Sequence, residues 1–180
     1  MSLYVALLRA VNVGGTAAVK MADLKAMAGD MGFDAVQTVL QSGNLVFRAA
    51  SGKDRGLESR IEAELERRFK LKTTVIVRSA GAWAKLVDGN PFGAEAKADP
   101  SHLLVMPLNA EPAAGAEAAL QAKIKGREEA RVVGDVAYIV YPDGIGRSKL
   151  TIAVIERALG VVGTARNWNT VMKLAALVGG

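Results

Sequence analysis

The chain has 180 residues, of which 51% are hydrophobic and 23% are charged, a composition typical of a globular protein with one domain or two small ones. It contains no cysteine, which excludes disulfides, thiolate metal sites and cysteine nucleophiles. Because no apolar run approaches the roughly 20 residues that span a bilayer and no secretory signal opens the chain, we expect a cytoplasmic protein without a membrane partner.

The net charge of +5 is concentrated near the carboxyl terminus. Residues 144–180 contain five basic residues and one acidic residue, so this segment carries +4 of the total. A local excess of positive charge favours an anionic ligand. An ordinary solubilising surface would produce the same excess.

In the first half of the chain the hydrophobic pattern predicts the order β-α-β-β-α-β. Strands are expected at residues 3–11, 35–40, 44–49 and 72–78, and helices at residues 19–32 and 54–70. The second helix is the more clearly amphipathic, because apolar residues recur every four positions at Leu57, Ile61, Leu65 and Phe69. Gly43 suits the turn of a hairpin between the two middle strands.

The second half repeats this order after a connecting helix at residues 79–92. Strands are expected at residues 102–108, on both sides of a Gly134-Asp135 turn within 129–141, and at 160–166; helices are expected at 112–124, 148–159 and 167–178. The order is again β-α-β-β-α-β, followed by one extra helix.

The expected fold class is therefore α+β, with two tandem ferredoxin-like (βαββαβ) units, a connecting helix and an extra C-terminal helix. Residues 1–78 would form the first unit, residues 79–100 the connecting helix and loop, and residues 101–180 the second unit with the C-terminal helix. A single larger mixed sheet is the alternative.

Two polar segments of the first half are expected to meet at one edge of its sheet. In a βαββαβ unit the first strand ends at the same edge as the turn between the second and third strands. This arrangement brings together side chains that can bond a polar ligand, namely Arg9, Asn12, Gln41 and Asn44. Ordinary turn chemistry would use the same residue types.

Two loops of the second half, residues 142–149 and 164–170, are expected to meet at the opposite edge. Both precede helices, whose exposed N–H groups and dipole attract anions, and arginine offers a planar fork suited to phosphate or carboxylate. Their candidate ligand-binding residues are Arg147, Ser148, Lys149, Arg166, Asn167, Trp168 and Asn169. We therefore predict that the two loops form one anion-binding pocket.

A structural role is the alternative for the second of these loops. Asn167 or Asn169 can cap the last helix, since asparagine directly before an apolar periodic run is common capping chemistry. Trp168 can fill a gap between the halves, and Arg166 can pair with a carboxylate.

The segments "YVALLRAVNVGG", "GFDAVQTVLQSGNLVF", "GRSKL" and "TARNWNTVMKL" resemble a bacterial family known as domain of unknown function 1697 (DUF1697). The resemblance covers almost the whole chain and implies a fold of two similar ferredoxin-like halves, without an established activity. The sequence departs from the family pattern at Ala10, where the family commonly has glycine, and at residues 16–18, where a basic residue is common.

The residues do not identify a reaction. His102 is the single histidine, and neither a GxSxG motif nor a P-loop is present, so no metal site is expected and the catalytic residues and cofactors stay unknown. Ser148 and Lys149 are adjacent, and neighbouring side chains on a helix point about 100° apart, which disfavours direct proton transfer between them.

Three functions remain open. The first is a protein that binds a small anion such as a nucleotide or a phosphorylated metabolite. The second is a metal-independent enzyme of unknown reaction that positions and polarises its substrate. The third is a nucleic-acid binder that contacts phosphate through the basic carboxyl-terminal segment. The oligomeric state is not decided by the sequence.

Overall fold

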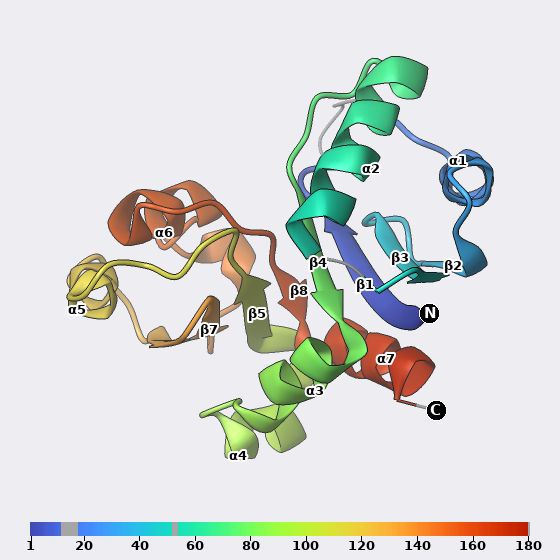
Figure 1. The fold of residues 1–180 in the computed structure, drawn as a ribbon. Coiled ribbons are helices and arrows are strands. Elements are labelled where there is room, and N and C mark those ends of the chain that lie inside the picture. Colours follow the sequence, from blue (N-terminus) through green and yellow to red (C-terminus); the bar gives the residue numbers. More distant parts are fainter. Residues whose placement is uncertain (12–17, 52–53, 180) are drawn as a thin grey trace. The chain divides into compact units, whose positions relative to one another are not determined.

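The computed structural model describes residues 1–11, 18–51 and 54–179 (Figure 1). The chain divides into two compact units: unit 1 comprises Met1–Lys85 and Leu174–Gly180, and unit 2 comprises Leu86–Lys173. Each unit contains one four-stranded antiparallel sheet, so the protein is a mixed α+β protein.

The sheet of unit 1 has the strand order β2-β3-β1-β4. Its strands are β1 (Ser2–Leu8), β2 (Asp34–Val39), β3 (Asn44–Ala49) and β4 (Val75–Ser79). The central strand β1 is antiparallel to both of its neighbours, and its residues from Tyr4 to Leu8 are all buried. The apolar run at the start of the sequence is therefore a strand buried on both faces, as predicted.

Two helices, α1 (Met21–Asp30) and α2 (Asp54–Phe69), pack against one face of this sheet. The core between them and the sheet includes Leu24, Met27, Leu57, Ile61, Leu65, Tyr4, Leu8 and Phe47. Because Leu57, Ile61 and Leu65 recur every four residues, a single stripe of α2 faces the sheet. The periodicity of the sequence correctly identified this buried stripe.

Charged side chains join α1 to α2 on their outer surface. Arg68 of α2 bonds Asp30 of α1 at 2.7 Å and also pairs with Glu64 in its own helix. The guanidinium of Arg60 lies 5.3 Å from the centre of the Phe33 ring, within the range of a cation–π contact. These contacts cover the edge of the apolar core with polar groups.

The connection between the sheets begins with α3 (Ala80–Asp88), whose first turn is capped because the Ala82 N–H donates to Ser79 Oγ at 3.2 Å. The short helix α4 (Gly93–Ala98) and the 3₁₀ turn η1 (Pro100–His102) follow, and neither was predicted. Both are too short to show a helical period in the sequence.

The sheet of unit 2 has the corresponding order β6-β7-β5-β8. Its strands are β5 (Leu103–Pro107), β6 (Glu129–Val133), β7 (Val136–Val140) and β8 (Arg166–Asn167). Strands β6 and β7 form the predicted hairpin, in which Gly134 takes a positive φ of 59°. Helices α5 (Ala116–Gln121) and α6 (Ile152–Leu159) pack against one face through residues such as Leu120 and Ile155.

Helices α5 and α6 and the last strand of unit 2 are shorter than predicted. Helix α5 starts only at Ala116, because Gly115 before it has a left-handed φ of 85°. Helix α6 starts at Ile152 rather than at residue 148, because Thr151 adopts an extended conformation and caps the helix by accepting a hydrogen bond from Val154 N–H. A 3₁₀ turn, η2 (Ile145–Arg147), precedes it.

The last strand is also reduced, to β8 and an isolated bridge between Leu108 and Gly163. Pro107 has no N–H to contribute to the ladder at this point, which explains the interruption. The two segments approach each other closely at Gly163 and leave no room for a side chain, since a Cβ there would lie 2.7 Å from the Pro107 carbonyl oxygen.

The final helix, α7 (Trp168–Val178), was predicted. It begins where Asn167 Oδ1 accepts a hydrogen bond from Thr170 N–H at 3.0 Å. Asn167 is therefore the cap of this helix, one of the two roles expected for it. None of the helices in the described part of the chain is both long enough and apolar enough to cross a bilayer.

Glutamate side chains cover one edge strand in each sheet. In unit 1, Glu62 and Glu58 of α2 accept hydrogen bonds from Val75 and Val77 N–H of β4, at 2.9 and 2.8 Å. In unit 2, Glu117 of α5 accepts one from Val132 N–H of β6 at 2.8 Å. These contacts occupy donors that an edge strand otherwise offers to another chain.

Candidate functional site

The loop that follows β7 lines a pocket of about 240 Å³ in unit 2. Three of the predicted ligand residues, Arg147, Ser148 and Lys149, are brought together here. The other residues that line the pocket are Lys125, Gly126, Glu128, Asp143 and Gly144. The pocket thus contains basic and acidic side chains, and its binding preference depends on which of them are already engaged.

Both carboxylates of this pocket are held by neighbouring groups. Asp143 accepts two hydrogen bonds from the guanidinium of Arg127, which lowers the pKa of Asp143 and raises the pKa of Arg127. Glu128 accepts a hydrogen bond from the Ser148 hydroxyl and another from Gly126 N–H at 3.0 Å. The bond from Ser148 is the main cause of the lowered pKa of Glu128.

The basic residues of the pocket are held less directly, although the charge of Arg147 also contributes, after Arg127, to the lowered pKa of Asp143. Across residues 1–11, 18–51 and 54–179, Lys125, Arg147 and Lys149 form no ion pair with a carboxylate, and the Arg147 and Lys149 residues are exposed. Their positive charges are therefore available to a molecule that enters the pocket.

The contact between Ser148 and Glu128 does not favour nucleophilic catalysis. The hydroxyl donates to Glu128 and accepts a hydrogen bond from Leu150 N–H at 3.0 Å. A carboxylate whose pKa is lowered is a weak base for removing the serine proton. The arrangement instead fixes the loop at residues 144–150 against the segment that carries Gly126 and Glu128.

The residues of the second predicted loop have other surroundings. Arg166 is 9% exposed, and its guanidinium donates to Thr164 Oγ1 at 2.7 Å and to the Ala165 carbonyl at 2.9 Å. Burial lowers the pKa of Arg166 to about 10. Trp168 is half-buried and Asn169 is exposed.

The two loops do lie at the same end of the sheet. Both β7 and β8 are antiparallel to β5 and flank it, with Val140 opposite Leu103 and Asn167 opposite Leu104. The ends of both strands are thus near the start of β5, as the topology predicted. The pocket is lined by the first loop and includes no residue of 164–170, so a ligand role for Arg166, Asn167, Trp168 and Asn169 stays a prediction.

In unit 1 the predicted contact between the end of β1 and the β2–β3 turn is present. Leu8 N–H donates to the Gly43 carbonyl at 2.9 Å, and Gly43 has the expected positive φ, 78°. Asn44 is fully buried and donates to the Val39 carbonyl at 2.7 Å and to Ser42 Oγ at 2.9 Å. Part of the role of Asn44 is therefore to hold the turn.

The other predicted ligand residues of unit 1 are less concentrated. Gln41 is exposed, and Asn12 lies outside the described residues. Arg9 is half-buried and lines a second pocket, between the end of β1, helix α2 and the segment before β4. A ligand role for these residues stays a prediction.

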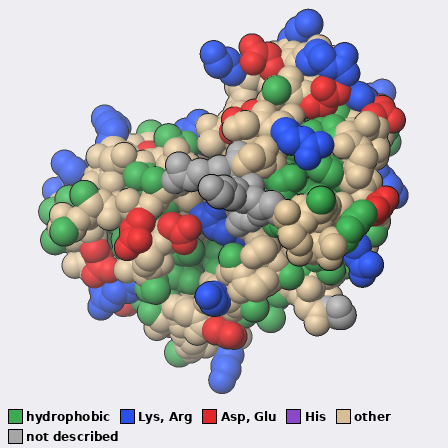
Figure 2. Space-filling view, in the orientation of Figure 1, with side chains coloured by type: hydrophobic (Ala, Val, Ile, Leu, Met, Phe, Trp, Pro, Cys, Tyr) green, Lys and Arg blue, Asp and Glu red, His purple; other side chains and the backbone are tan. Residues whose placement is uncertain are grey.

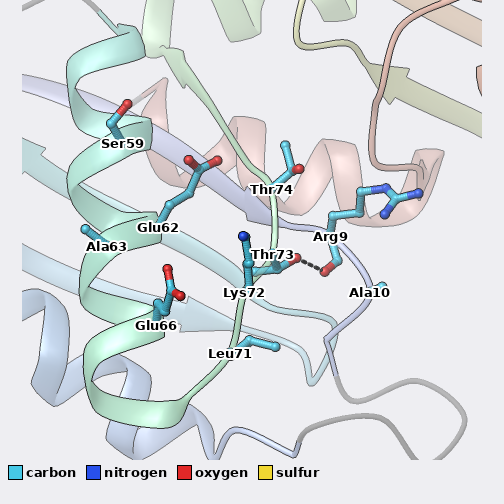
Figure 3. A pocket seen from close by; sticks show the side chains of 10 residues that line it. All are labelled: Arg9, Ala10, Ser59, Glu62, Ala63, Glu66, Leu71, Lys72, Thr73 and Thr74. Atoms are coloured by element: carbon cyan, nitrogen blue, oxygen red, sulfur yellow. Dashed lines mark hydrogen bonds between the residues drawn. The ribbon is translucent and has the colours of Figure 1, made fainter.

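The second pocket has a volume of about 620 Å³ (Figure 3). Its lining residues are Arg9, Ala10, Ser59, Glu62, Ala63, Glu66, Leu71, Lys72, Thr73 and Thr74. Sequence reasoning missed all of these except Arg9. The spacing of Ser59, Glu62 and Glu66 on one side of a well-predicted helix was an available signal, but it is also the pattern of a solvent-facing surface.

Charged side chains of the two signs are interspersed on the surface over the α2 part of the molecule (Figure 2). This part of the surface is therefore not a continuous basic surface of the kind that follows a nucleic-acid backbone. The described residues also contain no group of three or more His, Cys, Asp or Glu side chains that could hold a metal ion.

The chain is similar in structure to a conserved bacterial protein, SP0830 from Streptococcus pneumoniae. The TM-score is 0.76 at 18% sequence identity, over 98% of this chain and 98% of that chain, which shows a shared fold. No curated protein sequence matches the chain. The family model for proteins of unknown function DUF1697 matches residues 1–138. The chain therefore belongs to the DUF1697 family, as its sequence motifs indicated.

Proposed function

We propose that the protein binds a small anion of the phosphate class in the pocket of unit 2. One observation carries this proposal. Both carboxylates of the pocket are held by Arg127, Ser148 and Gly126, whereas its three basic residues form no ion pair within the part of the chain that the structure describes. The anion would complete the pairing of these charges.

The dimensions and chemistry of the pocket support a small ligand. Its volume of about 240 Å³ lies below the roughly 300–1,000 Å³ of pockets for drug-sized molecules, so a phosphate or diphosphate group suits it better than a whole dinucleotide. Arg147 supplies a planar fork for two phosphate oxygens, and Lys125 and Lys149 supply point charges.

The proposal extends to the fold and the location. We propose that each unit is ferredoxin-like, which the strand orders β2-β3-β1-β4 and β6-β7-β5-β8 support. Residues 1–78 and 101–180 would be the two domains, joined by residues 79–100. The absence of cysteine from the sequence supports a reducing compartment such as the cytoplasm.

Calorimetric titration with inorganic phosphate and with pyrophosphate tests the function. We expect saturable binding, with acetate as a weaker competitor because it carries a single charge. Arg147→Gln and Lys149→Gln should each weaken binding by about tenfold, since each removes a charge-assisted hydrogen bond.

Arg157→Gln is the matched control, because Arg157 is an exposed basic residue of α6 that does not line the pocket. It should leave the affinity unchanged apart from a small screened effect. Absence of saturable binding, or equal losses in Arg157→Gln and Arg147→Gln, would contradict the proposal.

A further inference from the structure

The pocket of unit 1 has two walls that carry opposite charges. Helix α2 contributes Glu62 and Glu66, and the segment before β4 contributes Lys72 together with the hydroxyl groups of Thr73 and Thr74. Figure 3 shows the two carboxylates extending from α2 toward this segment. The volume of about 620 Å³ is in the range of pockets that hold small organic molecules.

The acidic wall is fixed in place by the fold. One oxygen of Glu62 accepts a hydrogen bond from Val75 N–H at 2.9 Å, which holds its carboxylate at the pocket. Glu66 follows one turn later on the same side of the helix. Like charges four residues apart on a helix repel each other, and a cation placed between them relieves this repulsion.

The basic wall is fixed by contacts between β1 and the segment before β4. Arg9 N–H donates to the Thr74 carbonyl at 3.0 Å, and the Thr73 hydroxyl donates to the Arg9 carbonyl. Lys72 is exposed and forms no ion pair with Glu62 or Glu66, although all three line the same pocket. Opposite charges thus face one cavity without neutralising each other.

Small side chains leave the space between these charges open. Ser59 and Ala63 occupy the positions of α2 beside the two glutamates, one turn apart from each other. Larger side chains at these positions would fill the pocket next to the carboxylates. The wall therefore combines accessible charge with room for a ligand.

We propose that this pocket binds a small zwitterion, a molecule with an ammonium group and a carboxylate or phosphate group. The ammonium group lies between Glu62 and Glu66, and the anionic group is bound by Lys72 with the hydroxyl group of Thr74. A molecule with both charges satisfies both walls, whereas a simple cation or anion satisfies one and is repelled by the other. This site is independent of the anion pocket in unit 2.

Titration of the isotope-labelled full chain, followed by NMR at the Val75 and Thr74 amides, tests the proposal. The probes are amino acids of increasing charge separation: glycine, β-alanine, γ-aminobutyrate and ε-aminocaproate. Phosphoethanolamine distinguishes a phosphate from a carboxylate as the anionic group. Butylamine and butyrate carry one charge each and serve as controls.

We expect at least one zwitterion to give saturable shifts, with an affinity at least about tenfold higher than butylamine or butyrate. Glu66→Gln and Lys72→Gln should each reduce that affinity about tenfold. The matched controls Asp23→Asn and Lys25→Gln alter exposed charges on α1, outside the pocket, and should have no effect.

Three results would overturn the proposal. The first is the absence of saturable shifts with every zwitterion. The second is equal affinity for butylamine, which would indicate a simple cation site. The third is unchanged affinity in Glu66→Gln and Lys72→Gln, both of which alter exposed side chains and should leave the amide spectrum of the fold intact.

Discussion

The two units share a strand order but differ in the charges that their pockets present. In unit 2 the carboxylates of Asp143 and Glu128 are held by internal hydrogen bonds, which leaves basic groups for a ligand. In unit 1, Glu66 and Lys72 face the same pocket from opposite walls without forming an ion pair. The character of each pocket therefore depends on internal pairing as much as on composition.

The units also differ in backbone strain. Among the described residues, every non-glycine residue with positive φ belongs to unit 1: Ala10, Ala35, Leu40 and Lys70. In unit 2 the described residues with positive φ are glycines. Ala10 lines the unit 1 pocket and Lys70 directly precedes the segment that lines it. Strained backbone concentrates at functional sites in many proteins, so this difference agrees with a ligand site in unit 1.

The largest expected effect tests whether the helix glutamates that bond the edge strands have the same role in both units. Glu62→Ala leaves the buried Val75 N–H without its acceptor and should lower the free energy of unfolding by about 1–3 kcal/mol. Glu117→Ala should have a smaller effect, because Val132 is half-buried and water can replace the carboxylate. Urea denaturation measures both.

Glu66→Ala is the control for Glu62→Ala, because it removes a neighbouring glutamate of α2 that lines the pocket but holds no strand amide. Glu62→Gln should recover most of the stability, since its amide oxygen can still accept the hydrogen bond. If Glu62→Ala and Glu66→Ala have equal stability, the carboxylate does not protect the edge strand.

Substitutions at the ends of two helices test the difference in backbone strain between the units. Lys70 follows α2 with a φ of 54°, and Gly160 follows α6 with a φ of 70°; each donates its N–H to the carbonyl four residues earlier. Lys70→Gly should stabilise the protein by about 1 kcal/mol, and Gly160→Ala should destabilise it by a similar amount. Thermal or urea unfolding of the two variants measures these changes.

A stabilising Lys70→Gly together with a destabilising Gly160→Ala would confirm that unit 1 contains backbone strain at this position and that unit 2 avoids it with glycine. A destabilising Lys70→Gly would show that the side chain of Lys70 contributes more than its backbone conformation costs. Lys70 Nζ lies 3.4 Å from the Arg67 carbonyl, a contact that such a result would implicate.

The smallest expected effect concerns acid stability and the charges that join the helices of unit 1. Hydrogen bonds from Arg67 and then Arg68 lower the pKa of Glu64 from 4.5 to about 2. Because the folded pKa is lowered, this stabilisation is present above pH 4.5 and is lost as the pH falls to about 2. Glu64→Gln should therefore differ from the wild type most at neutral pH.

Unfolding free energies of the wild type and of Glu64→Gln, measured between pH 7 and pH 2, test this expectation. The difference should shrink below pH 4.5 and be mostly lost as the pH approaches 2. A difference that stays constant over this range would show that Glu64 acts through packing and not through its charge.

The sequence predicted the fold well wherever a regular period was present. The stripe of Leu57, Ile61 and Leu65 located α2, and the Gly134-Asp135 turn located the β6–β7 hairpin. The shorter elements were missed because their limits depend on single backbone conformations. The left-handed Gly115 shortens α5, and Pro107 interrupts the last strand.

The candidate site was predicted only in part. Arg147, Ser148 and Lys149 are consecutive, so the sequence itself placed them together, but their partner Glu128 comes from a segment that no motif marks. The polar residues around Arg166 in the sequence resemble a ligand site. They gave no sign that the Arg166 side chain donates hydrogen bonds to Thr164 and Ala165. Ala10 is informative in the opposite sense: its φ of 53° is a left-handed conformation that glycine adopts more readily, which agrees with the glycine that the resemblance to DUF1697 leads one to expect there.

An NMR titration of the full chain with inorganic phosphate tests the central claim most directly. The account expects saturable shifts at the amides of Gly126, Gly144 and Ser148, and expects them to be lost or strongly weakened in Arg147→Gln. Shifts that do not saturate at these amides, or that persist unchanged in Arg147→Gln, would contradict it.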